Sequence, residues 1–90
     1  MSKVNNWLRK TETGYAHWCP GCDMIHILPK EWWFNGDFIY PSFSPSFKDT
    51  ESNGKICHYV LVEGILHYTN DTTHKFKGRQ MALPELPEGY

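Results

Sequence analysis

Three cysteines are the residues of this sequence whose type and spacing most directly suggest chemistry. Cys19 and Cys22 enclose Pro20-Gly21, a turn that brings both thiols to one side of the chain. Zinc in a closed structural site takes four nitrogen or sulfur ligands in a tetrahedron, and two cysteines at this spacing form half of such a site. Cys57 is the third thiol. The sequence therefore predicts a zinc ion bound by these three cysteines, with a fourth ligand still to be assigned.

The fourth ligand is expected to be one of the five histidines. Residues 56–62 and 65–68 read as two strands of a hairpin, and this register places the turn 70–74 beside Cys57. His74 can therefore reach a metal bound by Cys57, and it is the first choice. His58 is the alternate fourth ligand if the strand bulges next to Cys57, and His26 is the third choice.

The cysteines allow two other interpretations. A Cys-x-x-Cys pair also serves redox chemistry in thioredoxin-type proteins, where it opens a helix after a strand. Here strand-like sequence flanks Cys19 and Cys22 on both sides, which favours zinc. The remaining alternative is that these two are free thiols and Cys57 is a small buried residue.

Composition limits the kind of protein. Ninety residues predict a single domain over residues 1–90, with residues 1–13 and 84–90 as peripheral segments. A net charge of −1 argues against binding to duplex nucleic acid, which needs several cations on one face. Neither a signal peptide nor a membrane span is recognised. These features predict a cytoplasmic protein with no membrane partner.

Turn signals at short intervals predict a mostly β fold, in which a zinc-stapled antiparallel domain carries a zinc-ribbon-like knuckle and a central hairpin. The knuckle is the tip of a hairpin made by residues 15–18 and 24–28. Asn35-Gly36 predicts a second hairpin between residues 32–34 and 37–40. The residues after Phe47, 48–55, are polar and read as an exposed loop. A last strand is expected within residues 78–83.

Aromatic residues are concentrated between the knuckle and the central hairpin. Burial in the core is their ordinary role. The alternative is an exposed surface for a partner, in which Trp32, Trp33, Phe43 and Phe47 would take part. Few cations are interleaved with them, which weakens a role in stacking on nucleic-acid bases.

Several short motifs follow one another in an order that resembles a known family. They are Cys19-Pro20-Gly21-Cys22, Phe34-Asn35-Gly36-Asp37, Pro41-Ser42-Phe43-Ser44-Pro45-Ser46, Cys57-His58, Asp71-Thr72-Thr73-His74, Gly78-x-Gln80 and Leu83-Pro84. The set resembles small phage and prophage proteins of uncharacterised function, some of them labelled ammonia monooxygenase. The resemblance implies a phage origin and a zinc site at Cys19, Cys22 and Cys57 with His58 or His74. It implies no activity.

The expected function is a binding module, in which zinc holds a small domain that binds and modulates a host or phage protein. An enzyme is not favoured, because thiolate-rich zinc sites are usually structural. The alternative is a zinc-dependent hydrolase with an open metal position and His26, Asp71 or His74 as proton carrier. A second alternative is single-strand nucleic-acid binding through the aromatic cluster.

Overall fold

The structure, a computed structural model, describes residues 2–3 and 7–87. Within these residues the chain forms β-strands joined by turns and loops, which confirms the predicted mostly β class. No helix long and apolar enough to cross a membrane occurs in this part of the chain. The strands are β1 (Ser2–Lys3), β2 (Arg9–Lys10), β3 (Gly14–Cys19), β4 (Met24–Pro29), β5 (Trp33–Phe34), β6 (Phe43–Ser44), β7 (Phe47–Thr50), β8 (Ile56–Val62), β9 (Ile65–Tyr68) and β10 (Gln80–Ala82).

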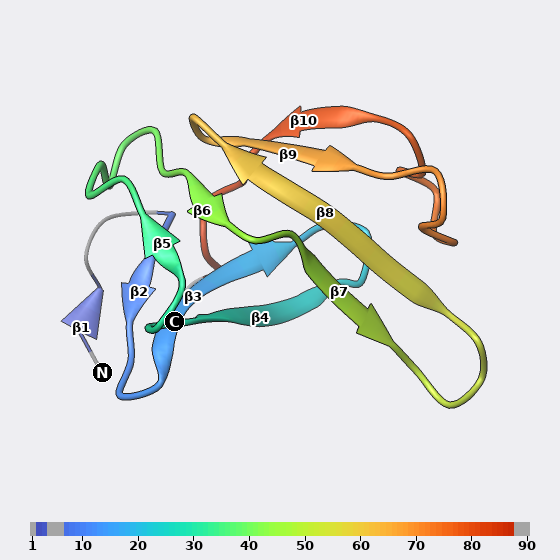
Figure 1. Cartoon of the computed structure of the whole chain (residues 1–90), viewed down its shortest axis with the longest axis horizontal. Helices are drawn as coiled ribbons and strands as arrows, with labels where there is room; N and C mark the ends of the chain where they lie inside the picture. Colours follow the sequence, from blue (N-terminus) through green and yellow to red (C-terminus); the bar gives the residue numbers. More distant parts are fainter. Residues whose placement is uncertain (1, 4–6, 88–90) are drawn as a thin grey trace.

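The strands form two antiparallel sheets and a small ribbon (Figure 1). One sheet has the order β1-β2-β3-β4 and the other β10-β9-β8-β7, while β5 and β6 pair with each other. The β3–β4 hairpin carries the Cys-Pro-Gly-Cys turn at its tip, as predicted, with Cys19 opposite Met24. The first sheet carries Cys19 at the end of β3, and the second sheet carries Cys57 on β8.

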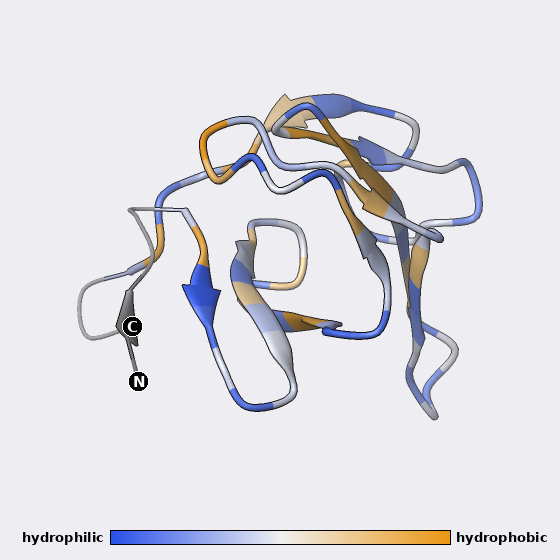
Figure 2. Ribbon diagram, turned by 60° about the vertical axis from the view of Figure 1, so that its left-hand side comes forward, coloured by the Kyte–Doolittle hydropathy of each residue, from blue (hydrophilic) through white to orange (hydrophobic). Residues whose placement is uncertain are grey.

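The central hairpin β8–β9 has the predicted register, with Val62 opposite Ile65 and Tyr59 opposite Tyr68. Its two-residue turn places Glu63 and Gly64 at positive φ, the backbone that such tight turns require. Alternate residues face inward, and the inward set is buried. It comprises Cys57, Tyr59, Leu61, Leu66 and Tyr68. Figure 2 shows the hydrophobic stretches of this hairpin.

The prediction of a hairpin around Asn35-Gly36 was wrong. β5 pairs with β6, so Phe34 lies opposite Phe43. The side chain of Asn35 accepts hydrogen bonds from the backbone N–H groups of Asp37 and Ser42. These side-chain bonds stabilise a wider loop in place of a two-residue turn.

The prediction of an exposed loop over residues 48–55 was also wrong in its first half. Phe47–Thr50 is strand β7, which pairs with β8 and places Lys48 opposite His58. The strand sequence is polar because its outward face is exposed. The pairing of β7 with β8 positions residues of one of the two candidate sites.

The segments expected to be peripheral also contribute to the interior. Leu8 is fully buried and Leu86 is 6% exposed. Leu83, next to the second segment, packs in the same core. Both outer segments therefore place a buried leucine in the interior of the domain.

Candidate active site and metal centre

The structure brings Cys19, Cys22, Cys57 and His74 together. Their four ligand atoms all lie within 4.8 Å of one another, and the Sγ atoms of Cys19 and Cys57 are 3.7 Å apart. The two half-sites come from different sheets, because Cys19 ends β3 and Cys57 lies on β8. Three sulfur atoms and one imidazole nitrogen suit a tetrahedral metal ion. The cluster could therefore hold a metal. Its four residues are the ones that the sequence predicts as ligands.

Only one of the three thiols in this cluster ionises readily unless a cation lies beside them. A hydrogen bond from Cys57 lowers the pKa of the Cys19 thiol to about 4, and the hydroxyl of Tyr68, 3.2 Å away, acts in the same direction. The same bond raises the pKa of Cys57, and burial raises that of Cys22 to about 11. One thiolate is stable here, whereas a second and a third require a positive ion beside them. The donor set therefore fits a metal ion.

Gly21 makes room for the fourth ligand. A Cβ atom at this position would overlap three atoms of the His74 imidazole. The ring of His74 also packs edge-on against Tyr68, with the centroids 4.7 Å apart. The Pro20-Gly21 turn thus forms a cradle for this imidazole as well as setting the spacing of the two cysteines.

The two alternative ligands lie elsewhere. His58 follows Cys57 on a regular strand, so its side chain points to the opposite face of the sheet. His26 is buried, and its Nδ1 lies 3.2 Å from the hydroxyl of Tyr59. Nε2 of His17 lies 2.5 Å from the same hydroxyl, and burial lowers the pKa of His17 to about 3. The imidazoles of His26 and His17 therefore belong to a buried polar network around Tyr59.

A second constellation lies on the outward face of the same sheet. Nε2 of His58 is 3.0 Å from the hydroxyl oxygen of Ser46. Nδ1 of the same ring is 3.0 and 3.1 Å from the two carboxylate oxygens of Asp71. A hydroxyl, an imidazole and a carboxylate in this sequence of contacts form the Ser-His-Asp arrangement of nucleophilic catalysis.

Three adjacent segments position these side chains. Lys48 on β7 lies opposite His58 on β8, and Ser46 precedes Lys48 by two residues, so all three project to one face. The third residue comes from the turn after β9, which runs beside the first half of β8. There Thr69 donates its backbone N–H to the carbonyl of His58. Ser46 and Asp71 therefore approach His58 from opposite sides of its strand.

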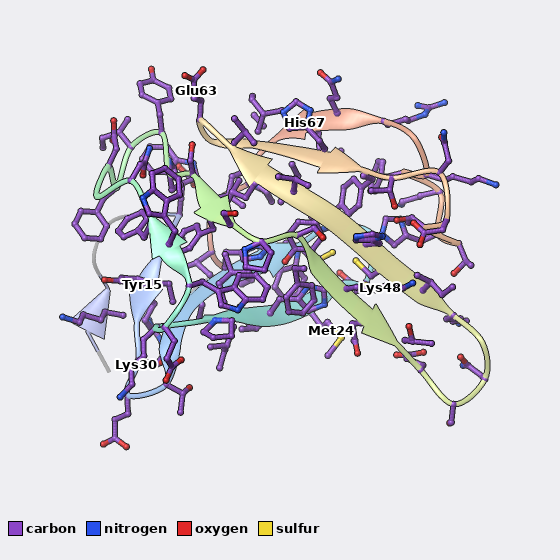
Figure 3. All side chains as sticks on the ribbon, viewed as in Figure 1. Tyr15, Met24, Lys30, Lys48, Glu63 and His67 are labelled. Atoms are coloured by element: carbon purple, nitrogen blue, oxygen red, sulfur yellow. The ribbon has the colours of Figure 1, made fainter. Side chains whose placement is uncertain are left out.

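The carboxylate of Asp71 is held in its ionised form. The hydroxyl of Thr69 donates to Oδ1 and is the largest cause that lowers the pKa of Asp71 to about 2. The contact with His58 acts in the same direction, as does Lys48, whose Nζ lies 3.4 Å from Oδ2. Figure 3 labels Lys48 on β7, beside β8. A carboxylate so placed orients the imidazole and stabilises its protonated form.

The aromatic residues proposed as a partner surface do not form one group. Phe43 is buried, stacked on Phe34 with centroids 4.5 Å apart, so it is not part of a surface. Phe47 is half-buried against His26 and Trp32 is partly buried. Trp33, 59% exposed, is open to solvent. Most of the cluster therefore belongs to the core.

Comparison with known proteins identifies a matching family. A family model described as BubE, bacterial ubiquitination-like system serine protease, matches residues 2–69. Neither a curated protein nor a solved structure matches the chain.

This match corrects three expectations. The resemblance to uncharacterised phage and prophage proteins is wrong, because the matching family is bacterial. The binding module and its alternatives, a zinc hydrolase and a single-strand nucleic-acid binder, are overturned by the description of the family as serine proteases. The view that an enzyme is not favoured is wrong for the same reason. It rested on the thiolate-rich cluster, which is separate from the serine arrangement.

The residues of the serine arrangement were not assigned this role from the sequence. His58 was weighed as a metal ligand, Asp71 as a proton carrier beside a metal, and Ser46 only as part of a proline-rich loop. The signal that could have found them is the alternation in residues 46–50. Pairing this segment with 56–59 would have placed Ser46 and His58 on one face.

Proposed function

The chain belongs to the BubE family of bacterial ubiquitination-like system serine proteases, and we propose that it is itself a serine protease that acts in such a system. The observation that carries the proposal is the pair of contacts around His58, with Ser46 on one ring nitrogen and Asp71 on the other. The family model ends at residue 69, so it covers Ser46 and His58, and Asp71 is added by the geometry.

The proposed reaction assigns one role to each residue. Ser46 Oγ attacks the carbonyl carbon of the scissile peptide bond while Nε2 of His58 takes the hydroxyl proton. Asp71 accepts a hydrogen bond from Nδ1 and stabilises the imidazolium that forms. His58 then gives its proton to the leaving amine, which departs as the acyl-enzyme forms. Water hydrolyses the acyl group by the reverse sequence of proton transfers.

For the Cys19, Cys22, Cys57 and His74 cluster we propose zinc in a structural role. Four protein ligands would fill a tetrahedral coordination sphere and leave no position for a substrate. The cluster also lies on the inward face of β8, away from the hydroxyl of Ser46. Zinc supplies cross-linking of the two sheets when bound, and the serine arrangement carries the chemistry.

The test is covalent labelling with a fluorophosphonate, a reagent that phosphonylates an activated serine. The intact mass of the purified, zinc-loaded chain should rise by one adduct, and peptide mapping should place it on Ser46. Ser46→Ala should remove the adduct. Ser44→Ala is the matched control, because Ser44 is an exposed serine of the same segment, and it should label as the parent chain does.

Two results would count against this assignment. If the folded parent chain takes up no adduct at concentrations that label other serine hydrolases, the arrangement is not an active one. If the adduct forms equally in Ser46→Ala, a different serine is the nucleophile.

A further inference from the structure

The two functional clusters share their supporting segments. On β8, the metal ligand Cys57 is followed directly by His58, the base of the proposed protease. In the turn after β9, Asp71 precedes the metal ligand His74 by three residues. The metal centre and the triad thus lie on opposite faces of β8 but are joined through the same two backbone segments.

The turn from 69 to 74 is attached to β8 by side-chain and backbone hydrogen bonds of its three threonines. Thr72 Oγ1 donates to the carbonyl of His58 at 2.8 Å and accepts from the N–H of the same residue at 3.0 Å. Thr73 donates its N–H to the carbonyl of Ile56, and its hydroxyl accepts from the N–H of Ile56. Each bond of this kind contributes a modest net stabilisation. Thr72 is buried, whereas Asp71 and Thr73 are exposed, so apolar packing adds little more.

His74 offers the turn a further anchor at its end. Its imidazole reaches the three cysteines, lies in the cradle left by Gly21 and packs against Tyr68. A metal–imidazole bond at this point would fix the end of the turn relative to Cys57. Because Cys57 is covalently joined to His58, it would also fix the distance between Asp71 and His58.

We propose that ligation by His74 positions Asp71, so that metal binding completes the proposed Ser46–His58–Asp71 triad. His74 is then a positioning residue that acts through the turn, and it touches no substrate. The inference rests on the proposed protease activity. It adds that occupancy of the metal centre sets the fraction of chains with an aligned triad.

The experiment compares the zinc-loaded parent with His74→Ala, His74→Cys and the exposed control Lys77→Ala. Each is assayed for bound zinc, far-ultraviolet circular dichroism and fluorophosphonate labelling rate. The fourth measurement is the low-field proton resonance of a hydrogen-bonded His58 Nδ1–H, which reports directly on the contact with Asp71.

His74→Ala should keep its β-sheet spectrum through the three remaining thiolates, lose the low-field resonance and label at least about tenfold more slowly. His74→Cys, which restores a fourth ligand, should recover the resonance and most of the rate. Lys77→Ala should match the parent. If the imidazole only filled space, replacing His74 by cysteine would restore neither the resonance nor the labelling rate.

Gly21→Ala serves as a second variant if His74→Ala fails to fold. Its methyl group overlaps the His74 ring and leaves every ligand in the sequence, so it should show the same loss of resonance and rate. A folded His74→Ala or Gly21→Ala chain with parental resonance and rate would overturn the inference. Global unfolding of both variants would overturn it too, since ligation by His74 would then be required for the whole fold and not for the position of this turn.

The outcomes also separate this inference from the function on which it rests. If Ser46 labels at the parental rate in the His74 variants, the proposed protease activity stands and only the positioning role of His74 is refuted. A parent chain that does not label at Ser46 removes the proposed function first.

Discussion

Replacing Asp71 by Asn tests the proposed triad at its most solvent-exposed member. The carboxylate contacts Nδ1 of His58 with both oxygens, at 3.0 and 3.1 Å. An amide at this position presents an NH2 group in place of one oxygen and carries no charge. It therefore weakens the preference for the tautomer in which Nε2 can accept the proton of Ser46, and it no longer stabilises the imidazolium.

The size of the effect follows from the exposure of Asp71. In a Ser-His-Asp site with a buried carboxylate, this substitution lowers kcat by about 10⁴-fold. The side chain of Asp71 is 43% exposed, so solvent screens its charge and can partly replace its hydrogen bond. We therefore expect a smaller reduction in the labelling rate, about 10²- to 10³-fold.

The assay is the rate of fluorophosphonate labelling at Ser46, measured by intact mass over time at neutral pH. Asp37→Asn is a suitable control, because it removes the same charge from an exposed turn while its side-chain oxygen can still accept the hydrogen bonds of that turn. A labelling rate for Asp71→Asn within threefold of the parent, in a folded chain, would refute the assignment of Asp71 as the orienting carboxylate.

Three further predictions concern the metal, the core and pH. Cys57→Ser should lose bound zinc and lower the midpoint of thermal unfolding by at least about 10 °C, because structural zinc contributes folding free energy; a parental midpoint and zinc content would contradict the site. Tyr59→Phe removes a hydroxyl that contacts two buried imidazoles and should cost about 2–4 kcal/mol of unfolding free energy in denaturant titrations, whereas the exposed Tyr40→Phe should cost less than about 0.5 kcal/mol. The lowered pKa of Asp71 means that the carboxylate stays ionised above pH 4 and its contribution is lost as pH falls toward 2; Thr69→Val should move this loss to higher pH in a carbon-detected titration, and an unchanged titration would show that Thr69 is not its main cause.

Features fixed by local sequence were predicted well. The two-residue turn Glu63-Gly64 predicts one register, which pairs Tyr59 with Tyr68, and the structure has that register. The Cys-Pro-Gly-Cys spacing and the same register were enough to select His74 as the residue beside Cys57. Both inferences use distances along the chain that a short turn makes predictable.

The remaining features depend on contacts that no local pattern specifies. β7 is polar and short, so only its pairing with β8 makes it a strand. Because this strand was missed, Ser46 had no place relative to His58, and a serine in a proline-rich segment has no distinctive spacing. Asn35 likewise closes a wide loop with side-chain hydrogen bonds, an outcome that competes with the turn its sequence suggests.

The turn that joins β9 to β10 sets the order of the proposed catalytic residues along the chain. It places the carboxylate after the imidazole, so the proposed catalytic order along the chain is serine, histidine, aspartate. Chymotrypsin-like, subtilisin-like and α/β-hydrolase enzymes each use a different order on a different fold. If Ser46, His58 and Asp71 act as proposed, this small β-domain reached the same chemistry by convergence, within one short contiguous stretch of gene that also encodes two of the metal ligands.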